Sequence, residues 1–178
     1  MGELWLLRHG ETAWSKTGQH TGRTDLPLLP EGEQAATALK PRLDRPWTLV
    51  LSSPLQRAWR TAELAGLRPE AEPDLMEWDY GAAEGIRTQD MGPGWRVWEA
   101  RDLGETLEQV ADRVRRVLAR VPADGDTLLV AHGHVLRILT AVFLGLSPRE
   151  AQHFVLKPTG LAILGREHEW PALKGWNL

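Results

Sequence analysis

Three segments of the chain share one pattern of hydrophobic and polar positions. In each, a short apolar run ends at an abrupt polar turn and a helical pattern follows; the runs begin at Leu4, Leu49 and Thr127. Short uninterrupted apolar runs are typical of strands buried on both faces, which occur in parallel α/β units. The pattern predicts an α/β fold: a three-layer sandwich with a mostly parallel central sheet flanked by helices. The chain length suits one domain spanning residues 1–178.

Capping signals and helical periods predict the elements that flank this sheet. Serine or threonine marks a helix start, proline suits the first turn, and glycine follows a helix end. The predicted helices run from Pro54 to Ala65 with Ser53 as N-cap and Gly66 beyond, from Val135 to about Leu144, from the capping box Thr106–Gln109 onward, and from Pro30 to a bend or end at Pro41. Leu161–Leu164 is predicted to supply one more strand.

The segment from Tyr80 to Gly104 has no clean hydrophobic period. It carries five glycines and several charges. Such a composition favours irregular structure over regular elements. We predict a long excursion over the sheet that roofs a site.

The charge balance excludes an overall basic surface. Lys and Arg total 21 against 24 Asp and Glu, a net charge of -3. Without an extended positive field the chain is not expected to bind nucleic acid or anionic lipid, so any anion site is local. The absence of cysteine excludes disulfides, thiolate metal ligation and a cysteine nucleophile. With no signal peptide and no apolar run of about 18 residues, we expect a soluble cytoplasmic protein.

The polar turns carry the candidate chemistry. Ligands of open α/β sheets bind at the carboxyl ends of the strands, where Arg8, His9, Arg57 and His132 are expected to converge. Guanidinium groups match phosphate oxygens with a planar fork of donors, and an imidazole can attack phosphorus to form a phosphohistidine. These residue types indicate a site for a phosphate dianion, with no metal and no other cofactor.

The turns also resemble the signature of a known family, the histidine phosphatase superfamily, also called phosphoglycerate-mutase-like. Residues 6–12 read Leu-Leu-Arg-His-Gly-Glu-Thr, and five further motifs follow in order. Together the motifs cover nearly the whole chain. The further motifs lie at 21–28, 52–58, 77–81, 104–106 and 131–134.

The resemblance implies a role for each site residue. His9 is the nucleophile, and Arg8, Arg57 and His132 are phosphate ligands. Glu77 is the acid that protonates the leaving oxygen. Burial beside Trp78 is expected to remove part of the water around its carboxyl group. Asp79 and Glu84 are weaker alternatives to Glu77. Motif residues that we also place in the substrate site are Ser15, where many relatives carry asparagine, Thr21, Gly22 and Gly133.

Several other residues keep two interpretations. His134 suits packing behind the site better than a metal pair with His132, since no third ligand is evident. Arg87, Arg96 and Arg101 either hold a second phosphate or lie in an exposed loop. Trp14, Trp95 and Trp98 either line the pocket mouth or pack in the core. His20, His153 and His168 are expected to be surface or structural residues.

The leading functional hypothesis is phosphomonoester hydrolysis through a phosphohistidine on His9. The motifs look most like the branch with sedoheptulose-bisphosphatase-like and broad acid-phosphatase members, so a small sugar phosphate is the expected substrate. A phosphoglycerate mutase is the alternative, although the mutases carry an arginine where this chain has Trp78. A non-catalytic phosphate-binding protein is the third hypothesis, and a homodimer is the assembly that the family implies.

Overall fold

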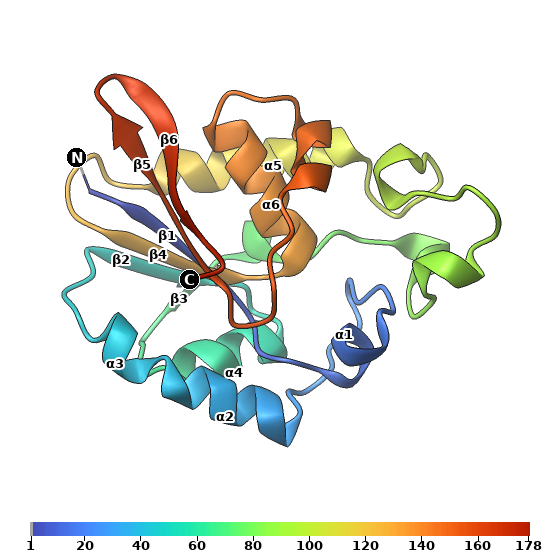
Figure 1. Ribbon diagram of the computed structural model, residues 1–178, viewed down its shortest axis with the longest axis horizontal. Coiled ribbons are helices and arrows are strands. Elements are labelled where there is room, and N and C mark those ends of the chain that lie inside the picture. The colour runs from blue at the N-terminus through green and yellow to red at the C-terminus, as the bar shows by residue number, and fades with distance from the viewer. Residues whose placement is uncertain (1) are drawn as a thin grey trace.

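A six-stranded sheet runs through the middle of the molecule (Figure 1). The structure, a computed structural model, describes residues 2–178. Along the sheet the strand order is β3-β2-β4-β1-β5-β6. The first four are mutually parallel, and β5 and β6 run antiparallel, which confirms the mostly parallel sheet. The strands are β1 (Leu4–Arg8), β2 (Leu49–Ser52), β3 (Glu70–Ala71), β4 (Thr127–Ala131), β5 (Leu161–Glu167) and β6 (Trp170–Trp176).

Helices cover both faces of the sheet and complete the predicted three layers (Figure 1). Alternate side chains of each buried strand face opposite layers: Leu6 packs in the core beneath α5 and α6, and Leu7 in the core beneath α3 and α4. This explains why the strands read as apolar runs without alternation. The helices are α1 (Ala13–Thr17), α2 (Pro30–Ala38), α3 (Lys40–Leu43), α4 (Gln56–Leu64), α5 (Leu107–Arg120) and α6 (Gly133–Phe143).

Two helix starts differ from prediction. Helix α4 begins at Gln56, because the Ser53 hydroxyl accepts the Leu55 N–H at 3.3 Å in a preceding turn and also contacts the His132 ring. The prediction of Ser53 as N-cap of a helix beginning at Pro54 is therefore wrong. Helix α6 begins two residues early, at Gly133, with no capping side chain on its N-cap residue.

The other helix predictions agree with the structure. The capping box at the start of α5 is present, with the Thr106 and Gln109 side chains each accepting from the other's backbone N–H. Helix α2 ends before Pro41, and the short α3 follows. Helices α4 and α6 are followed by Gly66 and Gly145 with left-handed φ of 81° and 72°. Helix α1 and strands β3 and β6 were not predicted.

The segment from Tyr80 to Gly104 is irregular, as predicted. It contains three short 3₁₀ turns, at Gly81–Ala83, Thr88–Asp90 and Val97–Glu99. Two more 3₁₀ turns lie elsewhere, at Pro73–Leu75 and Pro148–His153. Within residues 2–178, no helix combines the length and the apolar character needed to cross a membrane.

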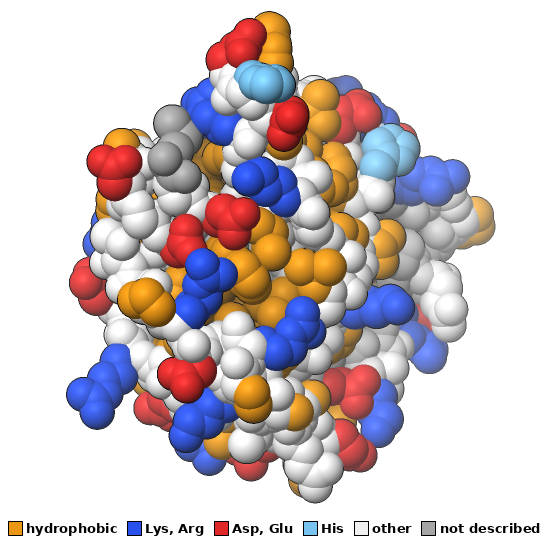
Figure 2. Space-filling model, turned by 60° about the vertical axis from the view of Figure 1, so that its left-hand side comes forward, with side chains coloured by type: hydrophobic (Ala, Val, Ile, Leu, Met, Phe, Trp, Pro, Cys, Tyr) orange, Lys and Arg blue, Asp and Glu red, His pale blue; other side chains and the backbone are white. Residues whose placement is uncertain are grey.

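The two ends of the sheet differ in polarity. At the amino end of β1, a groove of about 330 Å³ is lined mainly by apolar side chains such as Leu118, Val142 and Phe143. In Figure 2 hydrophobic side chains gather in the middle of the face at this end of the molecule. At the carboxyl end, β1, β2 and β4 run into Arg8, Ser53 and His132, where polar groups are collected.

Candidate active site

A cavity of about 200 Å³ lies at the carboxyl end of the sheet. Its wall is formed by the end of β1 and the turn after it, the start of α6, the segment after α1 and the irregular roof. The lining residues are Arg8, His9, Ser15, Gly18, Gln19, His20, Thr21, Glu77, Tyr80, Thr88, Gly133, His134, Arg137 and Leu156.

The His9 ring is held in one tautomer. Its Nδ1 lies 2.7 Å from the Gly10 carbonyl oxygen, and since a carbonyl only accepts, Nδ1 carries the proton. Nε2 therefore keeps its lone pair. Burial, with the charges of Arg57 and Arg8, lowers the pKa of His9 well below its usual value of 6.5. The imidazole is neutral at neutral pH, as a nucleophile must be.

Arg8 presents unpaired donors beside this ring. Its Nη1 donates to the Leu156 carbonyl at 2.6 Å, whereas its buried Nε has no hydrogen-bond partner. Burial lowers the pKa of Arg8, and the Glu77 carboxylate partly offsets that effect. A buried donor without a partner is costly, and an anion in the cavity would supply the missing acceptor. Gly133 leaves room for this guanidinium, since a Cβ there would lie 3.3 Å from Arg8 Cζ.

Glu77 is fixed by the start of α6. Its carboxylate accepts the backbone N–H groups of Trp78 and Val135 on Oε1 and of His134 on Oε2, each at 2.9 Å. The side chain thus satisfies two helix-start donors that the N-cap residue His132 leaves free. Oε2 keeps room for one more hydrogen bond. Within residues 2–178, Glu77 is the only carboxylic acid lining the cavity.

Arg57 and His132 form a layer behind the cavity and do not line it. Arg57 is fully buried, and its Nε donates to His132 Nδ1 at 3.0 Å. His132 therefore carries its proton on Nε2, which donates to the Ser53 hydroxyl at 2.8 Å. The His132 ring lies 5.1 Å from the His9 ring. Burial, with the charge of Arg57, lowers the pKa of His132 well below 6.5, so this ring is also neutral.

The remaining Arg57 donors hold the loop at residues 21–24. Nη1 donates to the Thr24 carbonyl, and Nη2 donates to the carbonyls of Thr21 and Gly22, all at 2.9 to 3.0 Å. Glu84 completes the arrangement by accepting the N–H groups of Gly22 and Thr24. The loop is thus bound on both its donors and its acceptors.

Comparison with known proteins identifies the family of this chain. The model of the histidine phosphatase superfamily (branch 1) matches residues 4–178. The chain belongs to the histidine phosphatase superfamily. An acid phosphatase of Mycobacterium tuberculosis is 37% identical over 93% of this chain and 87% of its own. The sedoheptulose 1,7-bisphosphatase of Saccharomyces cerevisiae is 33% identical over 79% of this chain and 67% of its own. The chain is therefore a phosphatase of the histidine type.

Solved structures share the fold of this histidine phosphatase. The product of open reading frame Rv3214 from Mycobacterium tuberculosis superposes with a TM-score of 0.94 at 35% identity, covering 99% of this chain and 97% of that one. A phosphoglycerate mutase from Thermus thermophilus gives a TM-score of 0.79 at 36% identity, covering 99% and 98%. Phosphatases and phosphoglycerate mutases thus share this fold, and only the residues of the site can distinguish the two activities.

The predicted site residues divide into two groups in this histidine phosphatase. Arg8, His9, Glu77, Ser15, Thr21 and Gly133 all line the cavity, whereas Arg57, His132 and Gly22 lie behind it. The Ser15 hydroxyl accepts from Thr12 N–H and donates to the Thr12 carbonyl, so it already has partners. Gly22 packs so closely on the Trp78 carbonyl that a Cβ would lie 2.4 Å from that oxygen.

Tyr80, His134 and Arg137 are among the lining residues that the sequence analysis did not assign to the site. The Tyr80 hydroxyl hydrogen-bonds with His134 Nδ1, and burial raises the Tyr80 pKa well above 10. His134 is neutral, because burial and the charge of Arg137 lower its pKa well below 6.5. Arg137 donates to the carbonyls of Ala151 and Gln152 and stacks on Trp98, while its Nη1 bonds no acceptor within residues 2–178.

Most of the other candidate residues lie outside the cavity, so the structural interpretation applies to them. Arg87, Arg96 and Arg101 do not line the cavity, nor do the three tryptophans 14, 95 and 98. His153 and His168 are exposed, but His20 is buried and lines the cavity, where its Nδ1 donates to the Ile86 carbonyl. Asp79 and Glu84 accept backbone N–H groups outside the cavity. Within residues 2–178, no three His, Asp or Glu side chains are grouped to hold a metal ion.

Proposed function

We propose that this enzyme hydrolyses small phosphomonoesters by transferring the phosphoryl group to Nε2 of His9 and then to water. The observation that carries the proposal is the neutral His9 ring, whose Nδ1 proton is held by the Gly10 carbonyl beside the unpaired Arg8 Nε. A neutral imidazole can attack phosphorus, and the neighbouring guanidinium, which has a free N–H group, can bind the phosphate oxygens.

The proposed reaction has two steps. In the first, His9 Nε2 bonds to phosphorus as the ester P–O bond breaks, and Glu77 gives its proton to the leaving oxygen. In the second, water attacks phosphorus, Glu77 takes a proton from that water, and the P–N bond breaks. Inorganic phosphate leaves, and His9 and Glu77 return to their starting protonation states.

The proposed phosphate ligands act from two depths. Arg8 contacts the phosphoryl oxygens directly. Arg57 and His132 act from behind, through the Arg57 Nη1 hydrogen that bonds no acceptor within residues 2–178 and through the His132 Nε2–H, which donates to the Ser53 hydroxyl in the free protein. Because these donors are in place before the reaction, they stabilise its developing charge without reorganisation. No step of this mechanism uses a metal ion.

A sugar phosphate with a second anionic group is the proposed substrate class. Arg137 brings a second guanidinium to the cavity lining, with its Nη1 bonded to no acceptor within residues 2–178, and Thr88 adds a polar side chain to the same lining. The yeast relative named as a bisphosphatase fits this class. A mutase is less well supported because Trp78, where the mutases carry an arginine, is 1% exposed and donates its indole N–H to the Glu105 carbonyl. The single domain, the cytoplasmic location and the homodimer stay predictions.

The first test is phosphate release in the presence of a chelator. The panel contains p-nitrophenyl phosphate, sugar mono- and bisphosphates, nucleotides and 3-phosphoglycerate, with mutase turnover measured in parallel. Rapid quenching in base should trap a phosphoenzyme that acid destroys, as expected for phosphohistidine, and that is absent from His9→Ala. Negligible release beside bisphosphoglycerate-dependent mutase turnover would replace the proposal with the mutase. If neither phosphate release nor mutase turnover were detected, a non-catalytic phosphate-binding protein would be favoured.

A further inference from the structure

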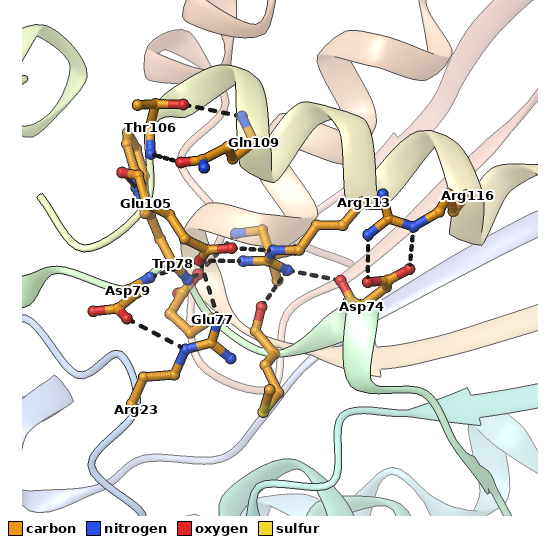
Figure 3. Close-up of polar contacts among 12 residues, drawn as sticks. Arg23, Asp74, Glu77, Trp78, Asp79, Glu105, Thr106, Gln109, Arg113 and Arg116 are labelled. Atoms are coloured by element: carbon orange, nitrogen blue, oxygen red, sulfur yellow. Dashed lines mark hydrogen bonds and ion pairs between the residues drawn. The ribbon is translucent and has the colours of Figure 1, made fainter.

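An ion pair between the buried Arg113 and the half-buried Glu105 lies behind Glu77 and does not reach the cavity (Figure 3). Arg113 of α5 is 5% exposed, and its Nε and Nη2 donate to the two carboxylate oxygens of Glu105 at 3.0 and 3.2 Å. The apolar positions Val110, Val114 and Val117 already dock α5 on the sheet. Desolvating a charge pair is costly, and apolar side chains would often stabilise such a place equally well. The pair therefore calls for an explanation beyond helix docking.

The ion pair fixes the backbone on both sides of Glu77. Arg113 Nη1 donates to the carbonyls of Asp74 at 2.7 Å and Met76 at 2.6 Å, just before the acid. Glu105 accepts the Asp79 N–H at 3.0 Å, just after it, and its carbonyl accepts the Trp78 indole N–H at 2.8 Å. Figure 3 shows these contacts converging around the segment that carries Glu77.

The same carboxylate reaches the loop that Arg57 holds. Arg23 Nη2 donates to Glu105 Oε2 at 3.2 Å, and Arg23 lies between the carbonyls of Gly22 and Thr24 that bind Arg57. Glu105 thus connects the segment of the proton donor with the loop behind the phosphate site. The loop at residues 21–24 and the segment that carries Glu77 are more than fifty residues apart in the chain, and Glu105 fixes the distance between them.

We propose that Arg113 and Glu105 are positioning residues, which hold the Glu77 carboxyl where it exchanges a proton with the leaving oxygen. The inference rests on the proposed function, because it assumes that Glu77 is the acid. Neither residue touches the substrate. Their effect on kcat/KM is therefore confined to esters whose leaving group needs a proton, because small displacements of a catalytic group slow only the steps in which it acts, and kcat/KM includes only the first of the two.

The test compares Arg113→Met with Arg116→Met. Arg116 lies one turn further on α5 and pairs with the Asp74 carboxylate at the surface instead of with backbone carbonyls. We expect Arg113→Met to lower kcat/KM for a sugar phosphate about 30-fold while p-nitrophenyl phosphate, whose leaving group needs no proton, is unaffected. Arg116→Met should change neither. Because kcat/KM reports events up to the first irreversible step, phosphoenzyme hydrolysis does not mask the difference.

A double variant guards against misfolding. Arg113→Met with Glu105→Leu removes both charges and the three hydrogen bonds that these side chains make with the backbone, and it should fold and show the same selectivity. Equal loss on both esters, no loss on either, or failure of both variants to fold would overturn the inference. Glu77→Gln is measured beside them. If Glu77→Gln shows the selective loss and the Arg113 variants do not, only the inference fails; if Glu77→Gln shows none, the role proposed for Glu77 fails as well.

Discussion

The cavity wall and the layer behind it differ in how completely their polar groups are bonded. Arg8, in the wall, leaves its Nε unpaired, whereas Arg57, in the layer behind, bonds protein acceptors with all three of its nitrogens. The two histidines differ in the same way. His9 keeps a free Nε2, and both ring nitrogens of His132 are engaged, by Arg57 and by Ser53.

This difference separates binding from positioning. An unpaired buried donor destabilises the free protein and gains a partner when an anion enters, so it favours binding. A guanidinium that already bonds protein acceptors through most of its hydrogens gains less from the ligand and fixes the spacing of its neighbours. The sequence motifs put both kinds of residue in one class, and only the hydrogen bonds separate them. Four predictions test the separation.

The largest effect is expected at His9, whose Nε2 is free in the cavity wall. His9→Ala removes the nucleophile, and phosphate release should fall by at least about 10⁴-fold on every ester. Its thermal unfolding should stay close to that of the parent protein. His153→Ala, at an exposed histidine, is the matched control and should keep full activity. A His9→Ala enzyme with near-parent turnover would rule out the phosphohistidine.

Exchanging each arginine for methionine sharpens the comparison. Arg8→Met should lower kcat/KM about 10²- to 10³-fold and change the free energy of unfolding little, because it also removes the unpaired buried Nε. Arg57→Met should in addition destabilise the protein by about 3 kcal/mol, because three loop carbonyls and His132 lose their donor. Steady-state kinetics and urea unfolding measure the two effects. Equal destabilisation by both variants would contradict the separation.

A smaller and selective effect is expected at Arg137. Arg137→Met should lower kcat/KM for sugar bisphosphates about 10- to 100-fold, the range for one charge-assisted hydrogen bond, and leave p-nitrophenyl phosphate unchanged. Arg149→Met is the control, because this arginine pairs with Glu99 at the surface. Were the bisphosphate to keep its parent rate, the second anionic group would not be bound by Arg137.

The fourth prediction concerns the pH dependence of folding stability. His9, His132 and His134 each have a pKa lowered well below 6.5 in the folded protein. Below pH 6.5 these histidines are therefore protonated in the unfolded chain but still neutral in the folded protein. Stability present above pH 6.5 is therefore lost as pH falls toward the lowered values, by up to about 1.4 kcal/mol per unit for each histidine. Urea unfolding between pH 7.5 and 5.5 measures the slope, which His134→Phe should reduce. A flat profile would contradict neutral buried histidines.

Much of the site follows from the sequence because its residues sit where buried strands end. Arg8 and His9 follow β1 directly, and His132 follows β4, so the strand pattern alone brings them together. The bonding of Arg57 could not be predicted, since it depends on carbonyls of a loop that has no hydrophobic pattern.

Other misses have identifiable signals. Arg137 stood in an apolar helix that reads as buried, yet it lies one turn after His134 on the same face, which was the available signal. Ser53 has the chemistry of an N-cap, but the His132 ring takes its hydroxyl. Strand β6 contains Pro171 and Gly175, which count against a strand, and its edge position tolerates both.

The place of β1 in the sheet also bears on biosynthesis. The strand that carries Arg8 and leads into His9 is made first, yet it lies between β4 and β5, whose residues begin at Thr127 and Leu161. Contacts between such distant segments form slowly, and a nascent chain offers β1 no partner until most of its length has left the ribosome. Until then the apolar strand is exposed to chaperones and to other chains, so His9 is synthesised well before the strands that fix its position.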